Sequence, residues 1–140
     1  MNSNDTKKLI KMYESAPINQ SYEPKLTIEP HQSSIVIDVK PIHFHAANYL
    51  HGSVIFKLLD DAAFFAAQAQ EPDYFIVTAS FTVYFVRPVN SGQLTATGTV
   101  ITTTKNQFIA ESRVMNEQGK WVAKGSGVFQ RSNVDLSSTL

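Results

Sequence analysis

Residues 52–70 read GSVIFKLLDDAAFFAAQAQ, and most of these residues favour helices. A helix of this length would span about 27 Å. Apolar side chains cover most of its circumference, which predicts that the rest of the protein encloses it. The remaining side carries the polar side chains of Ser53, Lys57, Asp60, Asp61 and Gln68.

The chain after this helix alternates between apolar and polar residues, a pattern that is typical of strands. In residues 75–86, one face would carry Val77, Ala79, Phe81, Val83 and Phe85, and the other Thr78, Ser80, Thr82 and Tyr84. Turn residues then separate three further predicted strands, over residues 94–104, 108–115 and 121–130. Two shorter strands, over residues 25–28 and 34–39, precede the helix.

This order of elements predicts an α+β fold in which one curved antiparallel sheet wraps around one long central helix. Residues 1–140 would form a single domain. A short helix capped by Asn4 or Asp5 would end near Ser15, so that residues 1–20 form an N-terminal helix and connector. The polar residues 132–140 predict a frayed tail.

The composition excludes several classes of protein. Twelve basic and twelve acidic residues give a net charge of zero, so we expect neither a nucleic acid nor a membrane as partner. The chain has no cysteine, which excludes disulfides, thiolate zinc sites and a cysteine nucleophile. It shows no secretory signal and no segment that could span a bilayer, so we expect a cytoplasmic protein.

A short motif stands at the start of the long helix. His51-Gly52-Ser53 is followed by Asp60, nine residues after His51. In this spacing the sequence resembles the hotdog-fold acyl-CoA thioesterases of the PaaI type, whose His-Gly-Gly motif precedes an acidic residue by the same interval. The resemblance extends over about residues 40–130, through Thr78, Phe85-Val86-Arg87-Pro88 and the segment 119–125. It implies the hotdog fold and hydrolysis of an acyl-CoA or aryl-CoA thioester by a homo-oligomer, either a dimer or a dimer of dimers.

The chemistry of thioester hydrolysis fits this motif. Negative charge develops on the carbonyl oxygen, and a backbone N–H at a helix N-terminus can stabilise it, so we expect the Gly52 N–H to be the oxyanion donor. His51 would orient or polarise the carbonyl. The resemblance implies a site shared between protomers, with His51 and Gly52 from one chain and Asp60 and Thr78 from the other. Asp60 would act as general base or nucleophile, and Thr78 would position the water or the carboxylate.

Two positions depart from the family pattern. Ser53 replaces the second glycine, which narrows the space beside the thioester. His45 stands where many relatives carry an asparagine, and Asn48 is a nearby candidate to replace it. Together with Lys105, as a candidate for the CoA phosphates, these residues form the predicted substrate-binding set.

Other interpretations of the same residues stay open. Asp61 lies four residues after Lys57, so an ion pair along the helix is its expected role. The histidines lack the convergent ligands that a metal requires, and we expect no metal and no cofactor other than the CoA of the substrate. Two alternative functions remain: a hotdog hydratase or dehydratase acting on enoyl or hydroxyacyl thioesters, and a non-catalytic acyl-CoA binding module. Aromatic, short-chain and medium-chain acyl groups are all compatible with the sequence.

Overall fold

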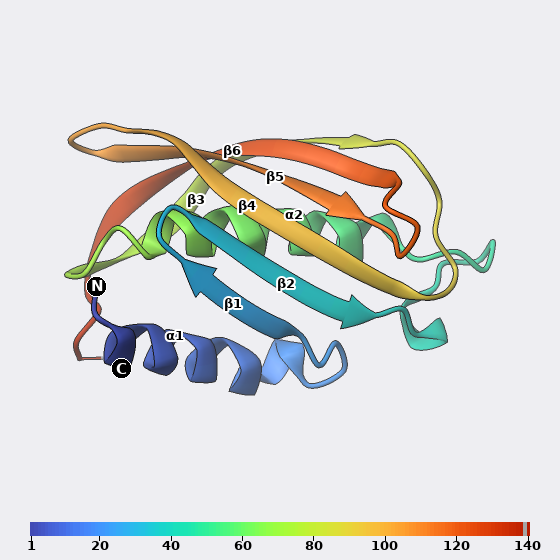
Figure 1. The fold of residues 1–140 in the computed structure, drawn as a ribbon, viewed down its shortest axis with the longest axis horizontal. Coiled ribbons are helices and arrows are strands. Elements are labelled where there is room, and N and C mark those ends of the chain that lie inside the picture. The colour runs from blue at the N-terminus through green and yellow to red at the C-terminus, as the bar shows by residue number, and fades with distance from the viewer. Residues whose placement is uncertain (139) are drawn as a thin grey trace.

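The computed structural model describes residues 1–138 and residue 140. Six antiparallel strands form one curved sheet in the order β1-β2-β4-β5-β6-β3, and the long helix α2 lies against its inner face (Figure 1). The predicted α+β hotdog fold is confirmed. The helical elements are α1 (Ser3–Ser15), the 3-10 turns η1 (Pro17–Asn19) and η2 (Pro41–His43), and α2 (Gly52–Gln68). The strands are β1 (Lys25–Glu29), β2 (Gln32–Asp38), β3 (Tyr74–Phe85), β4 (Gln93–Thr103), β5 (Gln107–Met115) and β6 (Trp121–Asp135).

Helix α2 approaches the sheet so closely that backbone meets backbone. A Cβ atom placed on Gly98 of β4 would lie 2.1 Å from the carbonyl oxygen of Ala62. Two buried serines of the sheet donate hydrogen bonds to helix carbonyls, Ser33 to Ala62 at 2.5 Å and Ser112 to Leu59 at 2.7 Å. These contacts fix both the rotation and the height of α2 on the sheet.

Helix α1 lies beside β1, on the side of α2 that the sheet leaves open (Figure 1). Its fully buried Leu9 and its Tyr13, which is 7% exposed, face the core. The cap is Asn2, whose side chain accepts a hydrogen bond from the N–H of Asp5, so the predicted cap at Asn4 or Asp5 was placed too late in the chain. This helix provides a second layer over one flank of α2.

The C-terminal segment differs from the prediction. Strand β6 continues to Asp135 instead of ending near residue 130, and Leu136 is only 1% exposed. The N–H of Leu136 donates to the carbonyl of Asp73 at 2.9 Å. The prediction of fraying from Ser132 is therefore wrong up to Leu136, because the polar residues there extend the pairing with β3 instead of facing only water.

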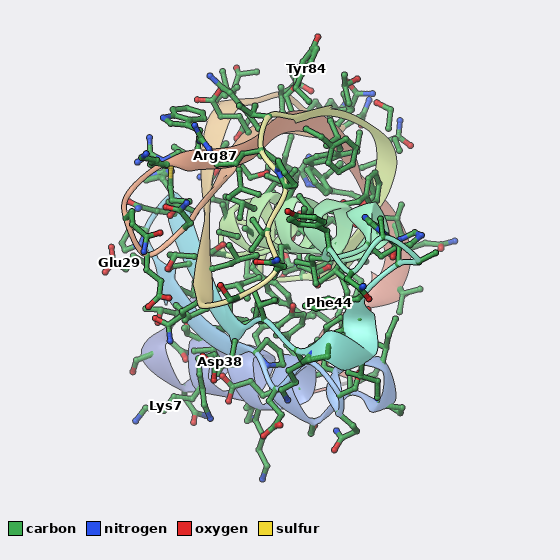
Figure 2. All side chains as sticks on the ribbon, turned by 90° about the vertical axis from the view of Figure 1, so that its right-hand side faces the viewer. Lys7, Glu29, Asp38, Phe44, Tyr84 and Arg87 are labelled. Atoms are coloured by element: carbon green, nitrogen blue, oxygen red, sulfur yellow. The ribbon has the colours of Figure 1, made fainter. Side chains whose placement is uncertain are left out.

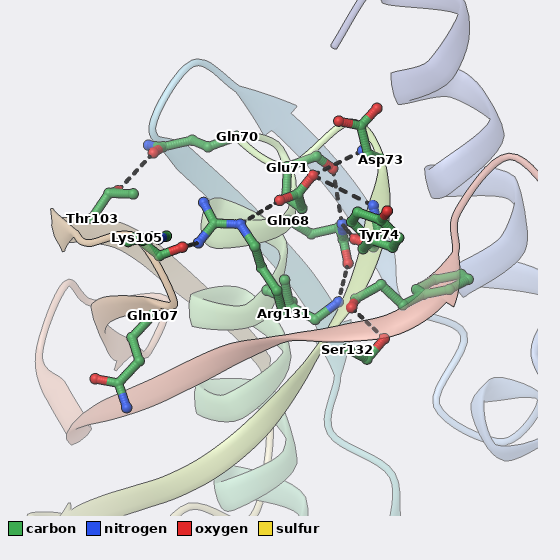
Figure 3. A network of polar contacts seen from close by, with 12 residues as sticks. Gln68, Gln70, Glu71, Asp73, Tyr74, Thr103, Lys105, Gln107, Arg131 and Ser132 are labelled. Carbon is green, nitrogen blue, oxygen red and sulfur yellow. Dashed lines mark hydrogen bonds and ion pairs between the residues drawn. The ribbon is translucent and has the colours of Figure 1, made fainter.

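A polar network closes the C-terminal end of α2 (Figure 3). Gln68, predicted on the polar side of the helix, is fully buried, donates to the carbonyls of Glu71 and Tyr74, and accepts from the N–H of Ile76. Glu71 is 5% exposed and pairs with Arg131 of β6. Burial acts to raise the pKa of Glu71, but backbone N–H donors and the Arg131 guanidinium hold that pKa below its ordinary value. The network joins the end of α2 to β3 and β6.

Candidate active site

Asp60 is half-buried in the middle of α2, and Thr78 faces it from β3. The Thr78 hydroxyl donates to Asp60 Oδ1 at 2.9 Å. The alternation of strand 75–86 placed Thr78 on the face opposite Phe81, and the structure shows that this was wrong. The register of β3 against β6 shifts between Thr78 and Ser80, so Ala79 is an extra residue and both Thr78 and Phe81 face α2.

The environment of Asp60 favours its protonated form. Burial is the main cause, and it raises the pKa of the carboxyl above its ordinary value. The nearby charge of Asp61 adds to this effect, while the Thr78 hydrogen bond and Lys57 oppose it. A carboxylate with a raised pKa is a stronger base than an exposed one, as a group that removes a proton from water requires.

Asp61 is engaged elsewhere. Its Oδ2 accepts a hydrogen bond from the Tyr13 hydroxyl of α1 at 2.6 Å and forms an ion pair with Lys57, one turn earlier on α2. The predicted pairing of Asp61 with Lys57 is confirmed. Burial, then the charge of Asp61, raises the pKa of Tyr13 above its ordinary value, so this hydroxyl stays a donor. The clasp made by Tyr13, Lys57 and Asp61 leaves Asp60 as the freer carboxylate.

The start of α2 is arranged around His51, which is the helix N-cap. Its Nδ1 accepts from the Ser53 N–H at 3.0 Å, and the Ser53 hydroxyl lies 2.8 Å from the same nitrogen. Because a backbone N–H can only donate, Nδ1 is unprotonated and the proton of the neutral ring lies on Nε2. The N–H of Val54 bonds to the His51 carbonyl. Within the part of the chain that the structure describes, the Gly52 N–H has no acceptor, as an oxyanion donor requires.

The remaining predicted residues lie farther from Asp60. The His45 ring lies 6.4 Å from the His51 ring, centroid to centroid, and its Nδ1 accepts from a backbone N–H. Asn48 has a φ of 65°, so it serves a turn in the 41–50 loop. Lys105 lies in the β4–β5 turn, where its carbonyl accepts from Arg131 at 2.6 Å (Figure 3). This turn is at the opposite end of the molecule from the 41–50 loop, so one chain does not bring Lys105 to His51 (Figure 1).

One chain therefore places the predicted catalytic residues in two separate groups. His51 and Gly52 stand at the N-terminus of α2, and Asp60 with Thr78 stands farther along the same helix. Nine residues of helix separate His51 from Asp60, a distance of about 13 Å. One small chemical group cannot contact both His51 and Asp60 within one chain.

A cavity of about 610 Å³ opens beside Asp60. Asp60, Thr78 and Ser53 border it on the side of α2 and β3. The opposite wall comes from α1 and the segment that follows it, through Met12, Tyr13, Ala16, Ile18, Asn19 and Tyr22. Sequence reasoning missed this wall, because no local pattern indicates that α1 packs over the helix that carries Asp60.

Two further observations concern ligands and membranes. Among residues 1–138 and 140, no group of three or more His, Cys, Asp and Glu side chains is placed to hold a metal ion. None of the helices in the same residues is both long and apolar enough to cross a membrane.

The segment that contains both groups of predicted catalytic residues matches a known family. The sequence pattern of the thioesterase superfamily matches residues 47–123, more than half of the chain. The chain belongs to the thioesterase superfamily. The superfamily match includes His51, Gly52, Asp60 and Thr78, and it begins after α1 and the connector. Among curated proteins, none matches the chain significantly.

Solved structures show the same fold. The PaaI protein of the E. coli phenylacetic acid degradation operon superposes with a TM-score of 0.84 at 22% identity, covering 94% of this chain and 95% of that one. A thioesterase from Haemophilus influenzae gives 0.81 at 18% identity, covering 91% and 90%. A variant of the phenylacetic acid degradation protein PaaI from Thermus thermophilus gives 0.76 at 22%, covering 84% and 100%. At these identities the likeness concerns the fold.

Proposed function

We propose that this member of the thioesterase superfamily hydrolyses acyl-CoA thioesters to the free acid and CoA. Membership in the superfamily supports hydrolysis of acyl thioesters in general. The observation that carries the proposal is the Asp60 carboxylate, which borders the cavity and is held by the Thr78 hydroxyl at 2.9 Å. A half-buried carboxylate beside an apolar cavity suits attack on a carbonyl that is shielded from bulk water.

Asp60 supplies the group that activates the attack. As general base, it takes a proton from a water molecule while the water oxygen bonds to the thioester carbon. The carbon–sulfur bond then breaks, and CoA leaves as the thiol after receiving the proton. As nucleophile, Asp60 would instead form an anhydride with the acyl group, which water then opens. Thr78 orients the carboxylate in either case.

The start of α2 supplies the stabilisation of the carbonyl oxygen. The Gly52 N–H lies at the positive end of the helix dipole. In other enzymes, removing one such oxyanion donor raises the activation free energy by about 3–4 kcal/mol. The Nε2 proton of His51 provides a second donor. Ser53, through its bonds to His51 Nδ1, holds the ring in the tautomer that this role requires.

We infer that two copies of the chain complete each site. Among the described residues, β3 has a strand partner on one side only, β6. Tyr84 is 67% exposed and Phe85 59%, and Tyr84 projects from the body of the molecule (Figure 2). Pairing two β3 edges would cover this apolar strand and bring the Gly52 N–H of one protomer towards Asp60 of its partner. Sedimentation at micromolar concentration tests this: a fully active monomer would contradict the shared site.

Release of the CoA thiol from a panel of acyl-CoA esters tests the function. We expect turnover by the wild-type protein and its loss in Asp60→Asn. The panel includes an enoyl-CoA, because hydration changes its absorbance without releasing thiol. A protein that hydrates the enoyl-CoA, or that binds acyl-CoA without turning it over, would overturn the thioesterase proposal.

A further inference from the structure

The cavity beside Asp60 is bordered by two separate segments of the chain. One wall belongs to α2 and β3, inside the segment 47–123 that matches the thioesterase superfamily. The other wall is built by residues 12–22, from the end of α1 through η1 and the following turn. This N-terminal wall contains none of the groups assigned to the reaction. Its side chains can therefore shape the cavity without taking part in the chemistry.

The N-terminal wall is held at a fixed position over α2. Tyr13 is buried, donates its hydroxyl to Asp61 at 2.6 Å, and packs the edge of its ring against Phe65 with the centroids 4.9 Å apart. The Lys57 ammonium lies 5.1 Å from the centre of the Tyr13 ring and 5.3 Å from that of Tyr22. These contacts tie both ends of the wall to α2, so the width of the cavity is set by the side chains between them.

Apart from Asn19, whose side-chain amide donates to the Tyr13 carbonyl at 2.7 Å, the side chains that line the cavity between these anchors are apolar. Ala16 and Ile18 face the cavity from the N-terminal wall, and Phe56 and Phe64 face it from α2. Among the described residues that line the cavity, Lys57 is the one basic side chain, and its charge is already paired with Asp61. An acyl group ending in a carboxylate would find no free cation there and would also face the charge of Asp60.

We propose that the N-terminal wall is the specificity-determining part of the protein and that it selects an uncharged, apolar acyl group larger than acetyl. This inference rests on the proposed thioesterase function and names the substrate class of that same site. Ala16 and Ile18 set the room available to the acyl chain. The closed clasp of Lys57 and Asp61 excludes acyl chains that carry a terminal carboxylate.

The test compares acetyl-CoA, hexanoyl-CoA and succinyl-CoA. We expect the wild-type protein to hydrolyse hexanoyl-CoA with a kcat/KM at least about tenfold above that for succinyl-CoA. Ala16→Phe fills the cavity and should lower kcat/KM for hexanoyl-CoA about tenfold or more while leaving acetyl-CoA turnover unchanged. Ile18→Ala, at an exposed rim position, should shift the preference the opposite way, towards longer acyl chains. Lys8→Phe, on the exposed face of α1, is the matched control and should change kcat/KM for neither acetyl-CoA nor hexanoyl-CoA.

The outcomes separate this inference from the proposed function. The wild-type protein could release thiol while both Ala16→Phe and Ile18→Ala keep its preference among acyl chains. That result would overturn the specificity-determining role and leave the thioesterase function intact. A preference for succinyl-CoA overturns the proposed substrate class. Failure of the wild-type protein to release thiol from any acyl-CoA overturns the proposed function, and the inference with it. If Ala16→Phe does not fold, as circular dichroism would show, the Ile18→Ala preference decides alone.

Discussion

Asp60 and Asp61 are adjacent and chemically identical, but the fold gives them different surroundings. The Asp61 Oδ2 accepts from both the Tyr13 hydroxyl and the Lys57 ammonium. Among the described residues, Asp60 accepts one hydrogen bond, from the Thr78 hydroxyl, and borders the cavity. The sequence predicted this division from the spacing to His51 and Lys57. It did not predict Tyr13, because a contact between residues 48 positions apart leaves no local periodic signal.

Asp60→Asn should lower the rate of thiol release by about 10²–10⁴-fold or more, because a side-chain amide is too weak a base to take the proton from water. The variant should stay folded, since it removes a half-buried charge and the Thr78 hydroxyl can still donate to the amide oxygen. Asp61→Asn should keep its activity within an order of magnitude and lose about 1–2 kcal/mol of stability, because the partly buried clasp loses its anion. Rates and thermal melts of both variants decide this; an inactive Asp61→Asn beside an active Asp60→Asn would reverse the assignment.

Thr78→Val should move the acid limb of the pH–rate profile to higher pH. Asp60 must be deprotonated to act, so the rate falls as pH drops through its raised pKa. The Thr78 hydrogen bond lowers that pKa, and removing it leaves burial and the charge of Asp61 less opposed. The measurement is kcat/KM against pH, with Thr82→Val on the outer face of β3 as the matched control. A limb that stays in place would show that Thr78 does not stabilise the charged carboxylate.

At the scale of the elements, the sequence predicted α2 and the strands, but it did not predict the register in which β3 pairs with β6. Periodicity indicated the central helix and the strands that surround it, because each must bury an apolar face. The bulge at Ala79 was not predictable, since the inserted residue is visible only in the pairing of β3 with β6. The alternation pattern placed Thr78 on the outer face for that reason, although the resemblance had already assigned it to the site. The extension of β6 to Asp135 was missed because its polar residues bond within the sheet.

Gly98→Ala should destabilise the protein by about 1–3 kcal/mol, because the new methyl group would overlap the backbone of α2 at Ala62. Moving α2 away from the sheet would also stretch the bond that Ser33 donates to the same carbonyl. Chemical denaturation measures the change, and Thr99→Ala, at the exposed neighbouring position, should stay within about 0.5 kcal/mol of wild type. A Gly98→Ala protein as stable as wild type would contradict the close contact.

At the scale of the whole molecule, the two ends of α2 differ in how their polar groups are hydrogen-bonded. The N-terminal end leaves the Gly52 N–H available, while at the C-terminal end Gln68, Glu71 and Arg131 satisfy one another (Figure 3). Sequence reasoning assigned Gln68 to a solvated side and gave Arg131 no role, because both act through partners brought together by folding. Helix α2 thus ends in a network of paired polar side chains at its C-terminus and begins with a backbone N–H that has no acceptor among the described residues.

Arg131→Met should cost about 1–3 kcal/mol at neutral pH, because Glu71 would keep a buried charge without its cation. Glu71 has a lowered pKa, so its ionised form stabilises the fold above the ordinary glutamate value, and that contribution is lost as pH falls through the folded-state value. The difference in the free energy of unfolding between wild type and Arg131→Met should therefore become smaller at acidic pH. Denaturation series at neutral and acidic pH measure it, and a Glu71→Gln background should remove the pH dependence; a constant difference would exclude the ion pair as its cause.

The position of the N-terminal wall has a consequence for how such a protein can change over time. The groups proposed to act in hydrolysis lie within residues 47–123, whereas the side chains that shape one side of the cavity beside Asp60 lie within residues 12–22. Ala16 and Ile18 lie outside the buried core, so mutations at these two positions can reshape the cavity without touching a group assigned to the reaction. If the proposed function holds, exchanging residues 12–22 for the corresponding segment of another hotdog protein would change the acyl group that is accepted and leave α2 untouched.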